Sequence, residues 1–234
     1  MDPHTRARDV VAEMLERSQM PQAEAGRRAV TAADRQYWAR LAPDLSVETA
    51  APATWPLDPL EIDDTDLHTA VAQFQDDAYF QTPPLLPATV LAPLNRAIDA
   101  VVAEGWPPVF AWVYDEVWLC ARLPAVARLL ASRLGAGYAQ IPHIWIHVVP
   151  GVAGAAGWPP HFDGFASGRA SVWVALTAAT AANGCMHVVP PRLLPPGFNK
   201  ATVEGSIPMS DAVQALQSVR SAGASRCITG VAPA

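Results

Sequence analysis

The stretch that decides the fold is Ser171-Val-Trp-Val-Ala-Leu-Thr177, with Ile141-Pro-His-Ile-Trp-Ile-His-Val-Val149 before it and Cys185-Met-His-Val-Val189 after it. The period of two in these segments, together with the Gly- and Pro-rich turns between them, predicts strands. The segments upstream of Ile141 have helical spacing instead. Helices followed by an antiparallel β region predict an α+β fold, a β-sandwich or jelly roll with helices packed outside it.

Five upstream segments are predicted to be helical, because apolar residues recur in them at helical spacing. Thr31 is the expected N-cap of the second helix, and Gly135 is the expected stop after the fifth. The third helix is expected to lead into a strand. The predicted helices span residues 7–17, 31–41, 67–80, 91–105 and 123–134.

Residues 42–66 have a different composition. Prolines alternate with acidic residues there, which is typical of an extended linker. We therefore divide the chain into residues 1–66, an N-terminal helical segment with a Pro-rich linker, and residues 67–234, the jelly-roll domain.

Charge and hydropathy exclude several classes of protein. The 234 residues carry a net charge of −6 and contain a single lysine, Lys200, so no basic face for nucleic acid is expected. No apolar run reaches membrane-spanning length, and acidic residues interrupt the N-terminus, where a signal peptide would need an apolar segment. We therefore expect a cytoplasmic protein without a membrane partner.

The three cysteines, Cys120, Cys185 and Cys227, are widely spaced. An odd number without a CxxC pair predicts neither a disulfide framework nor a cysteine-ligated metal site. Reduced thiols in a reducing compartment are the simplest interpretation.

The candidate chemical centre is His161-Phe-Asp163. On extended backbone, residues two apart point to the same side, with their Cα atoms roughly 6.6 Å apart. An imidazole and a carboxylate can then converge on one cation. Two His and one carboxylate form one face of an Fe(II) site and leave positions open for O₂ and a co-substrate. The spacing alone fits a surface turn with a capping Asp equally well.

His143 and His147 are the next candidates, since His-x-x-x-His on a helix is a zinc pair. Their neighbours predict a strand instead, on which positions four apart are separated by about 13 Å and cannot share one small cation. We expect these histidines to be packed in the core or to line a pocket. The other interpretation is a substrate contact, with no preference between the two.

Three blocks of the sequence resemble the phytanoyl-CoA dioxygenase family. They are Trp158-Pro-Pro-His161-Phe-Asp163-Gly164, Val172-Trp-Val-Ala-Leu-Thr-Ala-Ala-Thr180 and Asn183-Gly-Cys-Met-His-Val-Val-Pro190, in the family's order and at suitable distances. The resemblance spans residues 70–200, approximately. It implies a double-stranded β-helix (jelly-roll) core. It also implies an Fe(II)- and 2-oxoglutarate-dependent dioxygenase that hydroxylates a small organic substrate.

The resemblance carries over to individual residues. It implies that His161 and Asp163 ligate the iron and that Trp173 lines the 2-oxoglutarate pocket. Asn183 matches the family's turn before the next strand, although a tight turn is sufficient to explain it. His187 lies in that strand at a position where the family varies, and we interpret it as packing. No catalytic residue beyond the metal ligands is predicted.

The chain departs from the family's pattern after the third block. The family has a third ligand, a His, and then an Arg that pairs with the co-substrate carboxylate. No His follows His187, and Pro190-Pro191 stands where the family has Pro-Gly-Ser-His. The residues from Ser218 onward are rich in Ala, Gly, Ser and Arg and lack strand alternation. We therefore expect a jelly roll that is incomplete at its C-terminus and binds metal weakly.

Three interpretations follow. The chain is a dioxygenase of this type, or a catalytically inactive or truncated jelly-roll remnant with an incomplete metal site, or a zinc-bound jelly roll that is no oxygenase. The third also needs another N or O ligand, so the missing His does not favour it. The sequence marks neither the substrate nor the oligomeric state.

Overall fold

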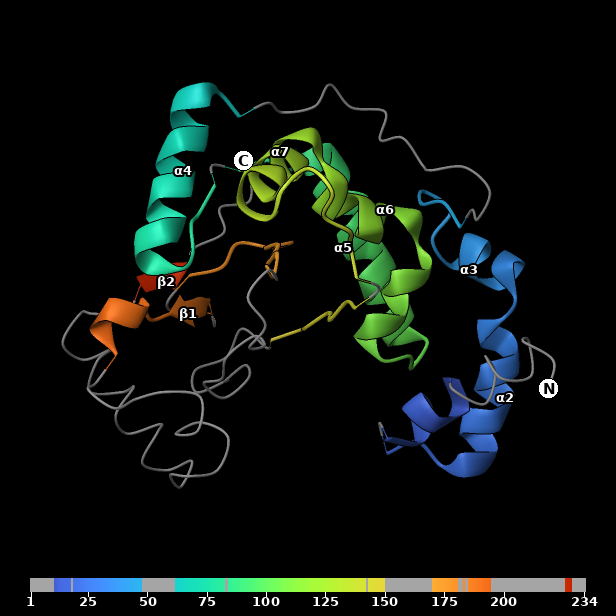
Figure 1. The fold of residues 1–234 in the computed structure, drawn as a ribbon. Coiled ribbons are helices and arrows are strands. Elements are labelled where there is room, and N and C mark those ends of the chain that lie inside the picture. The colour runs from blue at the N-terminus through green and yellow to red at the C-terminus, as the bar shows by residue number, and fades with distance from the viewer. Residues whose placement is uncertain are drawn as a thin grey trace. The chain divides into compact units, whose positions relative to one another are not determined.

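The computed structural model describes residues 11–17, 19–47, 62–82, 84–141, 143–149, 170–180, 183 and 185–194, together with the backbone of a strand at 226–228 (Figure 1). These residues fall into two units. Unit 1 holds the described parts of Met1–Pro56, Thr89–Cys120 and His143–His147, and unit 2 holds those of Leu57–Ala88, Ala121–Pro142 and Val148–Ala234. The domain boundary at residue 66 stays a prediction. Within the described residues, no helix combines the length and the apolar character needed to span a membrane.

Unit 1 is built from helices. Residues 11–17 are helical, which confirms that part of the first predicted helix. The elements that follow are α2 (Gln22–Ala32), α3 (Arg35–Leu41), α5 (Ala88–Ala103), η1 (Pro108–Val113) and α6 (Asp115–Leu119), with the 3-10 turn η2 (Cys120–Arg122) directly after α6.

The start of the helix predicted at Thr31 is wrong. Thr31 lies near the end of α2, and the cap of α3 is Asp34, whose side chain accepts a hydrogen bond from the Gln36 amide at 2.9 Å. A side-chain oxygen on extended backbone satisfies one of the free amides in a helix's first turn. The buried residues of α2 are Ala25 and Ala29, which give little apolar contrast in the sequence.

Aromatic rings fill the core of unit 1. The ring centroid of Trp38 lies 5.0 Å from that of Trp106 and 6.3 Å from that of Phe110, and Tyr114 approaches it edge-on at 6.4 Å. Trp38 is 1% exposed and Tyr114 is 0% exposed. Tilted, offset and edge-on ring pairs contribute to stability beyond the area that they bury.

A polar contact fastens the segment after α3 to α6. Glu116 accepts hydrogen bonds from the Ser46 amide at 3.0 Å and from the Ser46 hydroxyl at 2.6 Å. The Asp115 amide donates in turn to the Ser46 carbonyl at 3.0 Å. The described residues 42–47 are therefore held within unit 1, and the prediction of an extended linker is wrong for them.

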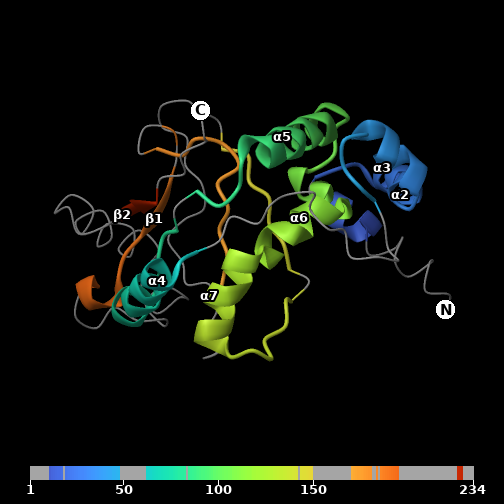
Figure 2. The ribbon, with the colours of Figure 1, turned by 90° about the horizontal axis from the view of Figure 1, so that it is seen from above.

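Unit 2 is built on α4 (Asp64–Asp77) and α7 (Pro124–Leu134), which pack against each other (Figure 2). The buried side chains in this contact are small or aliphatic, and they are Ile62, Ala70, Ala125 and Leu129. Arg128 of α7 donates to the Ile62 carbonyl at 2.9 Å and pairs with Asp64 of α4. Charged contacts thus supplement a small apolar core.

Glycines end the two helices for which the sequence predicts a stop. Gly105 follows α5 with φ +75°, and Gly135 follows α7 with φ +89°, a region that side chains with a Cβ rarely adopt. Both predicted ends are confirmed. Helix α4 ends instead at Ala78 with φ +60°, and residues 79–82 form no strand, so the strand predicted after the third helix is wrong.

The strands of the described residues form one two-stranded antiparallel sheet. β1 (Met186–Val188) pairs with β2 (Arg226–Ile228), and the 3-10 turn η3 (Pro191–Leu193) follows β1. β1 confirms the strand predicted in 185–189, whereas residues 143–149 and 170–175 are assigned to no strand. β-Forming residues need a neighbouring strand before they make a ladder, because their preference is largely one for packing in a sheet. The jelly-roll core stays a prediction.

Candidate functional site

The two predicted iron ligands, His161 and Asp163, lie outside the described residues. The predicted 2-oxoglutarate contact, Trp173, is described, lies in residues 170–175, which belong to neither a helix nor a strand, and is 42% exposed. The roles of all three residues stay predictions.

An Asn-centred turn leads into β1. Asn183 accepts a hydrogen bond from the Thr180 amide at 2.6 Å through Oδ1 and donates to the Ala178 carbonyl at 2.7 Å through Nδ2. The Cys185 amide donates back to the Thr180 carbonyl at 3.0 Å. An Asn side chain that bonds the main chain in this way stabilises a turn. Asn183 therefore fixes the point at which β1 begins.

The expectation that all cysteines are reduced is wrong for Cys185, which is disulfide-bonded, whereas Cys120 is free. The other half of this disulfide lies outside the described side chains. Nε2 of His187 lies 3.6 Å from the Cys185 sulfur, and the His187 side chain is exposed. The interpretation of His187 as a packed residue is therefore wrong.

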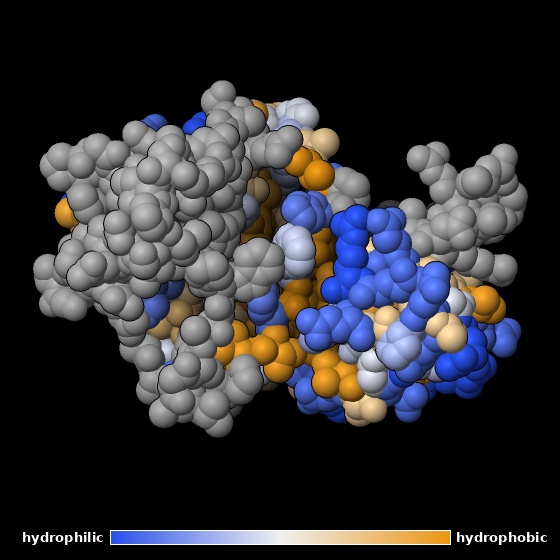
Figure 3. Space-filling view, turned by 90° about the horizontal axis from the view of Figure 1, so that it is seen from below, coloured by the Kyte–Doolittle hydropathy of each residue, from blue (hydrophilic) through white to orange (hydrophobic). Residues whose placement is uncertain are grey.

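His143 and His147 are also exposed, against the expectation that they are packed in the core. The indole Nε1 of Trp145 donates to His143 Nε2 at 2.8 Å, and Trp145 is itself 62% exposed. Apolar side chains thus reach the surface of the described residues, where they lie among polar ones (Figure 3).

Among the residues that the structure describes, no group of three or more His, Cys, Asp or Glu side chains converges on a point where a metal ion could bind. Neither His143 nor His187 lies in such a group, so the described residues contain no complete ligand set for iron or zinc.

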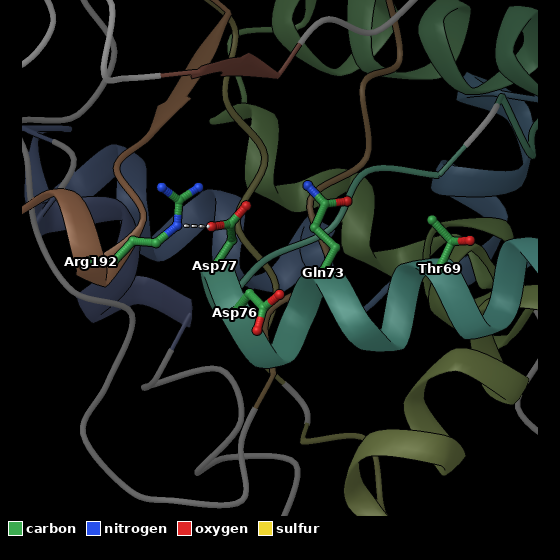
Figure 4. A pocket seen from close by; sticks show the side chains of 5 residues that line it. All are labelled: Thr69, Gln73, Asp76, Asp77 and Arg192. Carbon is green, nitrogen blue, oxygen red and sulfur yellow. Dashed lines mark hydrogen bonds and ion pairs between the residues drawn. The ribbon is translucent and has the colours of Figure 1, made fainter.

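A polar depression of about 560 Å³ lies along α4 in unit 2 (Figure 4). Thr69, Gln73, Asp76 and Asp77 line it from one face of the helix, because residues four, seven and eight positions apart share a face. Arg192 of η3 lines it from the other element.

An ion pair joins the two elements of this depression. Arg192 donates from Nε to Asp77 Oδ1 at 2.8 Å (Figure 4). The Asp77 side chain is 9% exposed and that of Arg192 is 54% exposed. Asp77 is the last residue of α4, where the negative end of the helix dipole disfavours a carboxylate, and burial disfavours it further. The guanidinium therefore compensates a carboxylate in an unfavourable position.

Sequence reasoning missed this depression. Asp77 and Arg192 are 115 residues apart, and no local pattern links two residues so far apart in the chain. The one signal available was a run of acidic residues, Asp76-Asp77, at the end of a predicted helix, where the dipole favours basic residues.

A second depression, of about 290 Å³, lies over the aromatic core of unit 1. Arg28 lies 4.9 Å above the Trp106 ring centroid and pairs with Glu24 at 3.1 Å. Trp106 donates from Nε1 to the Tyr37 hydroxyl at 2.8 Å. The Arg28 guanidinium thus covers the face of the Trp106 ring, and Glu24 and Tyr37 hold the pair in place.

Two titratable groups are buried in unit 1. The Tyr114 hydroxyl donates to the Trp38 carbonyl at 3.1 Å, and burial, with a smaller effect of Tyr37, raises the pKa of Tyr114 to about 12. Burial likewise raises the pKa of the Cys120 thiol to about 12. Because the thiolate is the reactive form of cysteine, Cys120 is a structural residue and not a nucleophile at neutral pH.

Comparison with family models, with curated proteins and with solved structures finds no match to this chain.

Proposed function

We propose that the chain is an Fe(II)- and 2-oxoglutarate-dependent dioxygenase of the phytanoyl-CoA dioxygenase type, with a jelly-roll core and a small organic substrate. The observation that carries the proposal is the order of three sequence blocks, 158–164, 172–180 and 183–190. The Asn183 turn and β1 support it, because they make a turn followed by a strand where the third block requires one.

Each residue has a stated task in this proposal. His161 and Asp163 hold the iron through an imidazole nitrogen and a carboxylate oxygen, and Trp173 packs against 2-oxoglutarate. Bound iron supplies the redox chemistry by which O₂ oxidises both 2-oxoglutarate and a C–H bond of the substrate. A third ligand must come from another N or O donor, and His143 and His147 are the first to test, since their side chains are exposed.

The second candidate function is that of a catalytically inactive binding protein with the family's fold. The observation that favours it is the absence of any histidine in residues 188–234. Two protein ligands hold Fe(II) less firmly than three, and such a protein would still bind a small molecule without turning over 2-oxoglutarate.

Anaerobic titration with Mn(II), followed by calorimetry, tests the metal site. We expect weak 1:1 binding that His161→Ala and Asp163→Ala each weaken by about tenfold or more, a loss that even residues behind the ligands can cause. His68→Ala is the matched control, because His68 is exposed on α4 and bonds the Asp64 carbonyl. Binding that neither His161→Ala nor Asp163→Ala changes would contradict the proposal.

Succinate formation under air, with Fe(II), 2-oxoglutarate and ascorbate, separates the two functions. Succinate production that His161→Ala abolishes identifies the dioxygenase. Metal binding at His161 and Asp163 without succinate identifies the inactive binding protein.

A further inference from the structure

The depression along α4 has the composition of a binding site for a small molecule. Its volume, about 560 Å³, is within the range of known ligand sites, which hold a few polar groups in fixed positions. Its polar groups come from two elements that the Arg192–Asp77 ion pair holds together (Figure 4). None of the described residues that line the depression is a proposed metal ligand, and this inference does not rest on the proposed function.

The guanidinium of Arg192 is oriented but incompletely used. Its Nε is engaged by Asp77, and its side chain is about half exposed. Among the described residues, no hydrogen bond to its two terminal amino groups is found. A guanidinium held through Nε presents these two groups as a planar fork, which matches the oxygens of a carboxylate.

The opposite charge lies at the same end of α4. Asp76 adjoins Asp77, lines the depression and is exposed. Arg192 compensates Asp77, so Asp76 leaves the described part of the lining with one excess negative charge. A ligand with a carboxylate alone would be repelled by Asp76, whereas a ligand that also carries an ammonium group would be attracted to it.

The remaining lining residues are neutral and polar. The Thr69 hydroxyl donates to the Thr65 carbonyl at 2.8 Å, so its oxygen is left to accept a hydrogen bond. Gln73 lies between Thr69 and the acidic pair on the same helix face (Figure 4). Its side-chain amide offers a donor and an acceptor to a polar group of a ligand.

We propose that this depression binds a free α-amino acid with a polar, uncharged side chain. Arg192 receives the carboxylate, Asp76 receives the ammonium group, and Gln73, about one helical turn away, faces the side chain. No metal is required.

L-Glutamine and two analogues, each lacking one charge, test the proposal on the full chain without iron. Glutaramate lacks the ammonium group, and 4-aminobutanamide lacks the carboxylate. By calorimetry or ligand-observed NMR, we expect L-glutamine to bind about tenfold or more tightly than either analogue, since each loses a charge-assisted contact. If glutaramate or 2-oxoglutarate bound as tightly as L-glutamine, the depression would be a site for carboxylates and the proposal would be overturned. The proposal would also be overturned if L-glutamine and both analogues failed to show saturable binding.

Two variants locate the site. Arg192→Gln should lower the affinity for L-glutamine by about tenfold or more, since it removes the charged fork. Asp76→Asn should make L-glutamine and glutaramate bind equally. Asp76 is exposed, so this variant tests the proposal even where Arg192→Gln disturbs folding, which circular dichroism of both variants checks. Unchanged affinities and unchanged preference in a folded Asp76→Asn would contradict the assignment.

Discussion

Unit 1 packs aromatic rings around Trp38, whereas unit 2 packs α4 against α7 through alanines, a leucine and an isoleucine. The aromatic core contains large side chains that are almost completely buried. The α4–α7 contact buries smaller side chains, and the Arg128–Asp64 ion pair lies at its margin. Stability in unit 1 therefore depends mainly on the burial of large rings, and the smaller apolar cluster of unit 2 should contribute less.

The position of the candidate binding groups follows from this difference. A binding site for a charged ligand needs charged groups held in place, and the buried Asp77 with its partner Arg192 supplies them in unit 2. In unit 1 the buried polar groups of Tyr114 and Trp38 bond main-chain carbonyls and leave no donor for a ligand.

The largest expected effect comes from truncating the centre of unit 1. Trp38→Ala should lower the free energy of unfolding by about 3–5 kcal/mol, because it removes a buried indole from contact with four other rings and leaves a cavity. Leu129→Ala in unit 2 should cost less, about 2 kcal/mol, since it removes a smaller side chain from a cluster with several partly buried members. Urea denaturation followed by circular dichroism measures both.

The control for this comparison is Trp145→Ala, which removes the same side chain from a site where it is 62% exposed. We expect a loss of under about 1 kcal/mol there. If Leu129→Ala destabilised the protein as much as Trp38→Ala, the contrast between the two units would be wrong.

Helices were predicted well where the apolar spacing and a stop residue agree. Leu91, Leu94, Ile98 and Val101 repeat at helical spacing, and Gly105 then ends the helix. Helix α2 is missed because its buried side chains are alanines, which give no clear apolar spacing. The start of α3 is misplaced because Thr31 and Asp34, three residues apart, are both residue types that cap helices, and the structure uses Asp34. At 143–149 and 170–175, β-forming residues predict strands, but a strand also requires a partner, and partners are set by contacts distant in sequence.

The candidate sites differ in the same way. His161 and Asp163 were found from sequence because their spacing and their neighbours are local signals. The Asp77–Arg192 depression was not found, because it is formed when η3 meets the end of α4, and that contact has no signature in either segment. Asp77 and Arg192 come together only through the tertiary contact between α4 and η3.

Stability should also fall at alkaline pH, where the two buried groups of unit 1 ionise. In the unfolded chain the Cys120 thiol titrates near 9.0 and Tyr114 near 10.0, whereas in the fold burial raises each pKa to about 12. The folded state therefore holds these protons more firmly, so stability is full below pH 9 and is lost as the pH rises toward 12. Between its unfolded and its folded pKa, each group should lower the free energy of unfolding by up to about 1.4 kcal/mol for each pH unit of increase.

Urea denaturation between pH 8 and pH 11 measures this loss. Cys120→Ala should move its onset from about pH 9 to about pH 10, the ordinary pKa of the remaining tyrosine. A profile that Cys120→Ala leaves unchanged would show that the thiol is not held protonated in unit 1.

The smallest effect should be the same in both units. Asp34 caps α3 in unit 1 by accepting from the Gln36 amide at 2.9 Å, and Asp63 caps α4 in unit 2 by accepting from the Asp66 amide at 2.7 Å. A cap satisfies an amide of its own helix, so its contribution is independent of the core that the helix packs on. Asp34→Ala and Asp63→Ala should each lower the free energy of unfolding by about 1 kcal/mol.

The control is Asp44→Ala, because Asp44 makes an exposed ion pair with Arg96, at 2.8 Å. This variant should lower the free energy of unfolding by less than about 1 kcal/mol. A cost at Asp63 that clearly exceeds the cost at Asp34 would mean that charge at the start of α4 also stabilises unit 2 through Arg128, which pairs with the neighbouring Asp64.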